Sequence, residues 1–135
     1  MSSAKRRVPI IHEQDVTRAL LEARMFAKGI DFAEVETQMI ATAVSELARN
    51  IIKYADKGEI IIDQIEKGYQ LGIEIFARDK GPGIADIEQA ITDNYSSSGT
   101  LGLGLPGVKR MMDEFEIHSI EGQGTTVQIR KWHRR

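Results

Sequence analysis

The feature that most constrains this chain is an alternating pattern at residues 71–79 that ends in a carboxylate. Apolar side chains occupy every second position, and the same two-residue step places Asp79 on the face that they share. Such a strand needs a packed layer on one side, where a carboxylate without a partner is strongly destabilising. Gly81 and Gly83 follow, and neither has a side chain to keep a ligand from the backbone. The pattern predicts a pocket for a flat molecule that carries an amine.

Size and composition indicate one globular unit. The chain has 135 residues, enough for one core, and we expect a single domain over residues 1–135. With 28% charged residues and a net charge of -2, no partner such as nucleic acid or a membrane surface is indicated. The absence of cysteine excludes disulfides and thiolate metal sites. The basic start runs into an apolar stretch too short for a signal segment or a membrane span, so we expect a cytoplasmic protein.

Strands and helices are predicted from periodicity and from turn residues. An edge strand is expected at residues 8–12, followed by a helix that opens near Asp15 and stops at Gly29. A second helix should run to about Tyr54, with Asp31 holding its first free amides in a capping box. The remaining predictions are strands at 59–65, 69–79, 116–121 and 125–132 and a short helix near 85–90.

One flank of the second helix carries polar side chains at helical spacing. Glu46 and Asn50 are four residues apart, hence stacked on one face, and Lys53 follows one turn later. The Asn50 amide oxygen suits a hard cation such as Mg²⁺. Glu46 could orient or deprotonate a hydroxyl, and Lys53 could meet phosphate charge. A solvated helix face has the same pattern, and these three residues taken alone favour that interpretation.

An uncharged segment rich in serine and glycine spans residues 94–108. We interpret about 92–102 as a lid that orders over a ligand, and a surface loop is the alternative. Pro106 favours a first helical turn, so Gly102 and Gly104 should stand at a helix N-terminus. Free amides at such a terminus suit phosphates, although a lone Gly-x-Gly is weak evidence.

The last predicted strand repeats the arrangement of Asp79. Thr125 alternates with apolar residues, which turns its hydroxyl toward the core. A shared ligand would explain two inward polar groups, and a hydrogen bond between Thr125 and Asp79 is the alternative. The three histidines lack metal-ligand spacing, and neither Walker-type nor Rossmann spacing is present.

Four short motifs occur in a characteristic order along the chain. They are Glu46-x-x-x-Asn50, Asp79-x-Gly81-x-Gly83, Gly102-x-Gly104 and Gly124-Thr125. In this order they resemble the GHKL, or Bergerat-fold, ATPase superfamily, and the small size is similar to its anti-sigma-factor serine/threonine kinase branch. The resemblance covers nearly the whole chain. It implies an α+β fold, a two-layer α/β sandwich whose mixed, mostly antiparallel sheet carries helices on one face.

The resemblance also implies a role for each candidate residue. Asp79 would accept a hydrogen bond from the adenine amine of ATP, and Thr125 would assist through water. By the same resemblance, Gly81, Gly83, Gly102 and Gly104 would line the nucleotide and its phosphates. Asn50 would hold Mg²⁺ and Glu46 would be the catalytic base. Lys53 would contact a phosphate. One departure is the lid, because residues 99–101 contain none of the basic side chains found there in some anti-sigma kinases. Lys80 or Lys53 would substitute, or phosphate transfer would be slower.

The implied activity is transfer of phosphate from ATP to Ser or Thr of small STAS-domain proteins of the stressosome. Such a kinase would also switch partners and activate a downstream effector, for example a serine phosphatase, in stress signalling. A nucleotide-gated anti-sigma or adaptor protein with little catalysis is the alternative, and a histidine-kinase-type catalytic domain is a further one. We expect a monomer or a weak dimer.

Overall fold

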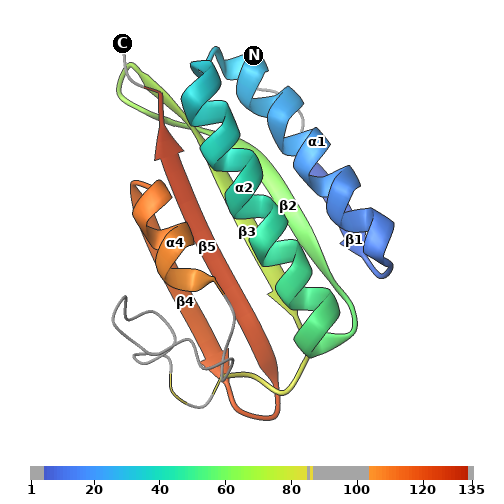
Figure 1. Ribbon diagram of the computed structural model, residues 1–135. Coiled ribbons are helices and arrows are strands. Elements are labelled where there is room, and N and C mark those ends of the chain that lie inside the picture. Colours follow the sequence, from blue (N-terminus) through green and yellow to red (C-terminus); the bar gives the residue numbers. More distant parts are fainter. Residues whose placement is uncertain (1–4, 85, 87–103, 134–135) are drawn as a thin grey trace.

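The computed structural model describes residues 5–84, 86 and 104–133, and Figure 1 shows an antiparallel sheet with helices lying across it. The elements in chain order are β1 (Arg6–Ile10), α1 (Glu13–Ile30), α2 (Glu34–Asn50), η1 (Ile51–Ala55), β2 (Gly58–Lys67), β3 (Gln70–Asp79), α4 (Leu105–Met111), β4 (Glu114–Ile120) and β5 (Gly124–Trp132). The predicted lid at about 92–102 lies outside the described residues. So does the short helix predicted near 85–90, except for residue 86.

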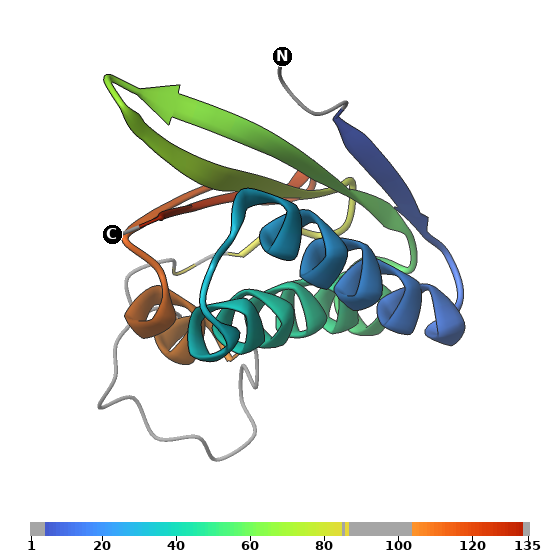
Figure 2. The ribbon, with the colours of Figure 1, turned by 90° about the horizontal axis from the view of Figure 1, so that it is seen from above.

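The strands pair in the order β1-β2-β3-β5-β4, and β1 lies at an edge as predicted. Viewed from above, α1, α2 and α4 all lie on one side of the sheet, which confirms the α+β two-layer sandwich (Figure 2). Every pairing between the described strands is antiparallel, so the expectation of a mixed sheet is corrected. Two of the pairings are hairpins, β2 with β3 and β4 with β5, and a hairpin can only be antiparallel.

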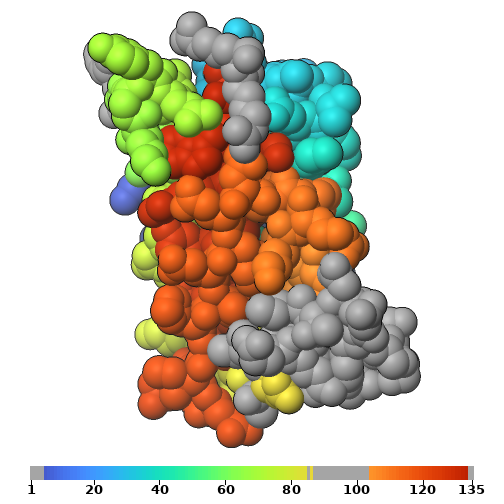
Figure 3. Space-filling model, turned by 90° about the vertical axis from the view of Figure 1, so that its left-hand side faces the viewer, coloured from blue at the N-terminus to red at the C-terminus, as the bar shows by residue number. Residues whose placement is uncertain are grey.

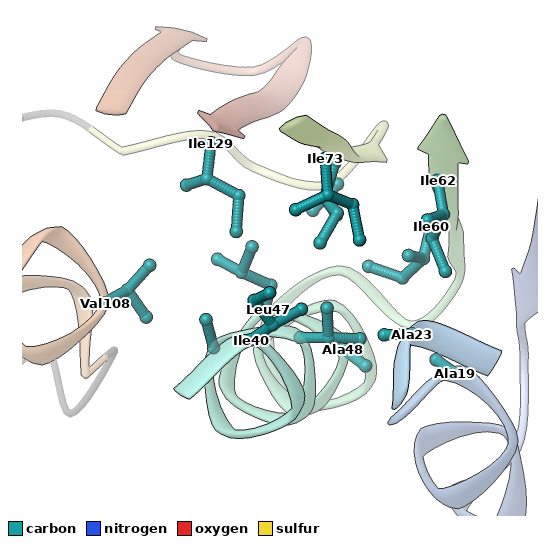
Figure 4. Packing of buried hydrophobic residues seen from close by; sticks show 14 of the residues in the cluster. Ala19, Ala23, Ile40, Leu47, Ala48, Ile60, Ile62, Ile73, Val108 and Ile129 are labelled. Atoms are coloured by element: carbon teal, nitrogen blue, oxygen red, sulfur yellow. The ribbon is translucent and has the colours of Figure 1, made fainter. Parts of the chain in front are cut away.

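The core lies between the helices and the inner face of the sheet. The alternation predicted along β3 is confirmed, since Ile73, Ile75 and Ala77 are at most 5% exposed. The predicted apolar stripe of the second helix is buried as well, since Ile40, Val44 and Leu47 of α2 and Ile51 of η1 are between 0 and 2% exposed. Figure 4 shows Ile40 and Leu47 facing Ile73 and Ile129, with Val108 of α4 approaching from one side. This single core fixes the two layers against each other.

The first helix begins and ends differently from the prediction. It starts at Glu13, and Asp15 lies inside its first turn, where Asp15 Oδ2 accepts the backbone N–H groups of Ile11 and His12 at 2.9 Å each. These two hydrogen bonds, first that from His12, lower the pKa of Asp15 below its ordinary value of 3.8. Asp31 ends α1 in a left-handed conformation (φ 81°) and does not cap α2.

The second helix starts after Ala33, which makes no side-chain cap, so the predicted capping box is wrong. The reason is the tight reversal between α1 and α2: Asp31 adopts the left-handed backbone that such a helix end requires, and aspartate tolerates that conformation.

None of the described helices combines the length and the apolar content needed to cross a membrane.

The helix continues past Asn50 to Ala55, close to the predicted end, but as the π-helix η1. A π-turn takes more residues per turn than an α-helix, so side chains after Asn50 do not follow the 3.6-residue period used for the prediction. Lys53 is exposed, and its Nζ lies 5.3 Å from the centre of the Tyr54 ring.

The two poles of the sheet differ. At one pole the hairpin between β2 and β3 projects beyond its neighbours, as the space-filling view of the β4 and α4 side shows (Figure 3). At the other pole β3 stops at Asp79, β5 starts at Gly124, and β2 starts at Gly58 opposite Asp79. We call this second pole the Asp79 end, and most of the predicted site residues lie toward it.

Candidate functional site

Asp79 is half-buried at the last position of β3, directly opposite Thr125 of β5. Its Oδ1 accepts the backbone N–H of Gly81 at 2.8 Å and that of Thr125 at 3.3 Å. Among the described residues, nothing donates a hydrogen bond to its second oxygen, Oδ2. The backbone therefore fixes the carboxylate by one oxygen and leaves the other available to a ligand. The expectation that Asp79 lies in register with the core-facing residues of its strand is confirmed.

The Thr125 hydroxyl has a different partner from the one that the sequence offered. Its Oγ1 lies 2.8 Å from the Oγ of Ser119 on β4, while Asp79 is bonded to the Thr125 backbone. Ser119 Oγ also accepts the N–H of Ile84 at 2.6 Å and lies 3.2 Å from the carbonyl oxygen of Gly124. Ser119 thus joins β4, β5 and the loop after Asp79. The sequence analysis missed it, although Phe115, Ile117 and Ser119 share the two-residue period that identified Thr125.

Two of the predicted ligand-lining glycines pack closely against the protein. A Cβ at Gly81 would lie 2.6 Å from the Cβ of Ala55, and one at Gly83 would lie 2.5 Å from the carbonyl oxygen of Ile120. Gly83 also has φ 80°, a backbone conformation that residues with a side chain rarely adopt. Both glycines therefore have a structural reason to be glycine, in addition to the ligand contact predicted for them. Gly102 lies outside the described residues.

The third glycine meets the predicted catalytic base. Gly104 precedes α4 with φ 67°, and a side chain there would collide with the Oε2 carboxylate oxygen of Glu46 on α2. The other oxygen of Glu46 lies 3.7 Å from Arg49 Nη1, and the Glu46 side chain is 36% exposed. The fold therefore brings two motifs that are far apart in sequence into contact, at a junction that solvent can reach. Arg49 was not singled out by the sequence analysis.

Asn50 lies one helical turn beyond Glu46, half-buried at the end of α2. The chain then leads directly to the Asp79 end. A Cβ at Gly58 would lie 3.0 Å from Ile51 Cγ2 and 3.1 Å from Asp79 Cβ. The end of the helix is therefore a neighbour of the carboxylate. Within the described part of the chain, no three His, Asp or Glu side chains gather into a metal site.

A separate hollow lies at the opposite pole, beside the hairpin. It has a volume of about 610 Å³ and is lined by Lys67, Tyr69, Gln70, Leu71 and His133. None of the predicted site residues contributes to it. The residues to which the sequence analysis assigned chemistry, among them Glu46, Asn50, Asp79 and Thr125, lie outside this hollow.

Comparisons with known proteins identify the family of the chain. The family model of the histidine kinase-like ATPase domain matches residues 12–131. The serine/threonine-protein kinase RsbT of Bacillus subtilis (strain 168) is 49% identical over 127 residues, which cover 94% of this chain and 96% of that protein. An anti-sigma F factor of Clostridium novyi (strain NT) is 30% identical over 137 residues, covering 97% and 96%.

A solved structure, the catalytic domain of the histidine kinase ThkA, superimposes with a TM-score of 0.51 at 14% identity, covering 93% of this chain and 95% of that one. At this identity the likeness shows the fold alone. The relatives and the family model together confirm the resemblance drawn from the four motifs. The chain belongs to the histidine kinase-like ATPase domain family.

Proposed function

We propose that this protein is an ATP-dependent protein serine/threonine kinase. The observation that carries the proposal is the contact between Glu46 and Gly104, which sets a carboxylate beside the start of α4 at a junction that solvent reaches. A relative named as a serine/threonine-protein kinase, 49% identical over nearly the whole chain, supports the same activity.

ATP would bind at the Asp79 end. The adenine amine would donate to Asp79 Oδ2, with Thr125 assisting through water, because Oδ1 is already held by two backbone amides. Gly81 and Gly83 would line the nucleotide, and Gly102 and Gly104 would line its phosphates. Lys53 is exposed and would contact phosphate, and the exposed Lys80 is a second candidate for the charge that the lid lacks.

Mg²⁺ would be held by Asn50 together with the phosphates of the nucleotide. A single amide oxygen suits this ion, which keeps several waters and shares phosphate oxygens. The described residues contain no cluster of carboxylates that would bind a metal by themselves, which fits an ion that arrives with its nucleotide. When bound, Mg²⁺ would neutralise charge on the phosphates.

Glu46 would act as the general base. The hydroxyl oxygen of a substrate Ser or Thr would form a bond to the terminal phosphorus of ATP, its proton would pass to Glu46, and ADP would leave. The contact with Gly104 and the nearby Arg49 restrict where the carboxylate can point. Its exposure of 36% leaves room for a protein substrate to approach.

The substrates we propose are small STAS-domain proteins of a cytoplasmic stress-signalling assembly, the stressosome. Phosphorylation would release the kinase, as a monomer or weak dimer, to a downstream effector such as a serine phosphatase. The relatives support action on proteins, since one is named as a protein kinase and another as an anti-sigma F factor.

Phosphate transfer tests the proposal. The protein would be incubated with Mg²⁺, ATP labelled in its terminal phosphate, and a candidate STAS-domain protein. We expect acid-stable label on the partner, and Glu46→Gln should slow labelling by about a hundred-fold or more. Glu116→Gln is the matched control, since Glu116 is an exposed carboxylate on β4. Equal labelling by Glu46→Gln and wild type would refute the role of Glu46.

An adaptor with little catalysis is the second candidate. It is favoured by the relatives named as anti-sigma F factors and by the absence of a basic side chain at residues 99–101. Nucleotide-dependent binding of a partner without any labelling would support it. Label that acid removes would instead indicate histidine-kinase chemistry.

A further inference from the structure

We propose that Arg49 selects the protein substrate by binding a carboxylate that lies beside the Ser or Thr to be phosphorylated. This inference rests on the proposed kinase function and adds to it the chemical class of segment on which the kinase acts. Arg49 lies almost one turn beyond Glu46 on α2, with its Nη1 3.7 Å from Glu46 Oε1. A group bound to Arg49 is therefore held next to the proposed base.

Arg49 has hydrogen-bonding capacity that the described protein does not use. A guanidinium group has five N–H donors and keeps its positive charge in proteins. Within the described part of the chain its polar contact is with Glu46 alone, and 3.7 Å is too long for a hydrogen bond. The Arg49 side chain is also 59% exposed. It can therefore donate to an anion that a partner protein brings.

The contact with Glu46 is easily exchanged for a better one. Ion pairs between exposed side chains contribute little to stability, and the Glu46 side chain is 36% exposed. A substrate carboxylate could accept two parallel N–H groups from the guanidinium, which is a stronger and more specific geometry. Arg49 would then leave Glu46, and Glu46 Oε1 would be available to the proton of the substrate hydroxyl.

The side of α2 on which Arg49 lies favours an anion of the protein substrate over the phosphates of ATP. Each residue turns an α-helix by about 100°, so Asn50 lies about 40° from Glu46 in one direction and Arg49 about 60° in the other. Gln38, three turns earlier on the side of Arg49, accepts a hydrogen bond from an arginine of α1 at 2.8 Å. Since α2 lies between α1 and α4 (Figure 1), Arg49 leans away from α4 and from the glycine at position 104.

The proposed class of substrate follows from these positions. For Glu46 to act as base, the acceptor hydroxyl must lie within about 2.6–3.2 Å of its carboxylate. A carboxylate bound to Arg49 would then lie a few ångströms from that hydroxyl. Because successive Cα atoms are about 3.8 Å apart, it belongs to a residue next to the acceptor in the chain or beside it in the substrate's fold. The substrate is thus a Ser or Thr with an acidic neighbour.

The first test separates the two substrates of the reaction. Wild type and Arg49→Gln would be assayed with Mg²⁺, labelled ATP and a candidate STAS-domain protein. We expect the KM for the partner to rise by about ten-fold or more, since hydrogen bonds between charged groups are lost. The affinity for ATP, measured by calorimetry, should stay the same. A loss of ATP affinity, or an unchanged KM for the partner, would overturn the inference.

The matched control is Arg7→Gln. Arg7 is also exposed and also contacts a carboxylate, that of Glu59, but it lies on the edge strand β1. This variant should label the partner as wild type does. Arg49→Lys keeps the charge but not the two parallel donors, so it should recover only part of the lost affinity. Full recovery by lysine would argue against a paired carboxylate.

The second test identifies the carboxylate. Mass spectrometry of the labelled partner locates the phosphorylated residue, and each acidic residue near it is then changed to its amide. One of these changes should lower kcat/KM of wild type by about ten-fold and have little further effect on Arg49→Gln, because the two groups bind each other. If no partner carboxylate is coupled to Arg49 in this way, the inference is wrong. If wild type labels no partner at all, the proposed kinase function itself fails, which is a separate result.

Discussion

Single residues at the Asp79 end combine two kinds of contact, one with the backbone and one left for a ligand. Asp79 Oδ1 is bound by the N–H groups of Gly81 and Thr125, and Oδ2 is not bound by any described residue. This division explains how a carboxylate can lie in register with the buried residues of a strand, because backbone N–H groups satisfy one of its two oxygens. The other half is the part that a purine amine would complete.

At Asp79 we expect the substitution Asp79→Asn to weaken ATP binding by about ten-fold or more, since hydrogen bonds to a charged group contribute about 1.5–3 kcal/mol. The amide of asparagine can still accept from both backbone N–H groups, so the fold should be retained. Calorimetric titration with ATP and a thermal melt measure the two effects. Asp63→Asn, on β2, is the control, and an unchanged ATP affinity in Asp79→Asn would contradict the site.

At the level of elements, the junction of α2 and α4 is where the predicted base meets the predicted phosphate-binding glycines. Gly104 has a left-handed backbone that disfavours a side chain, and a Cβ there would also displace the Glu46 carboxylate from its present position. The helix periods predicted both segments. Their contact depends on how α4 packs on α2, which local periodicity does not encode.

At this junction the prediction compares two glycines with similar backbone conformations. Gly104→Ala should destabilise the protein more than Gly68→Ala does. Both glycines have a positive φ, 67° and 62°, and a Cβ at Gly68 has nothing within 4 Å. The backbone cost, about 1–2 kcal/mol, is common to both, so the excess measures the collision with Glu46. Urea unfolding provides the values, and in a Glu46→Ala background the excess should disappear. Equal losses at the two glycines would show that the Glu46 carboxylate does not resist a side chain at position 104.

On the scale of the whole molecule, one core between two layers holds every described element in place. The outer face of the sheet carries charged side chains in contact, such as Arg130 with Glu74 at 2.7 Å and with Glu114 at 3.2 Å. Trp132 Nε1 donates to Glu114 at 2.7 Å, and this bond, ahead of those from Arg130, lowers the pKa of Glu114. The helices cover the other face (Figure 2).

A shared core predicts cooperative unfolding. Ile75 is fully buried at the centre of β3, so Ile75→Ala should lower the free energy of unfolding by about 2–5 kcal/mol. Trp132 fluorescence and far-ultraviolet circular dichroism should report the same transition. Ile120→Ala should have little effect, since Ile120 is 59% exposed. Two separate transitions, or equal losses for both variants, would argue against a single core.

Much of this protein was determined by its sequence alone. Periodicity is a local property, so the residues themselves predicted the strand at 69–79, the buried stripe of α2 and the inward orientation of Asp79 and Thr125. Four motifs in order predicted the family. Local reasoning failed where one residue could fill two roles. Asp31 could end the first helix or cap the second, and in the structure it ends the first.

Only the tertiary structure decided which distant groups meet. Ser119 faces Thr125 because β4 pairs with β5 in one register, and Glu46 meets Gly104 because α4 packs on α2. The close approach of Gly81 to Ala55 depends on the same packing. Each of these contacts joins segments that are far apart in the chain, and the local sequence pattern does not predict it. The free energy that stabilises such a contact comes from burial of the whole core, which involves all the elements together.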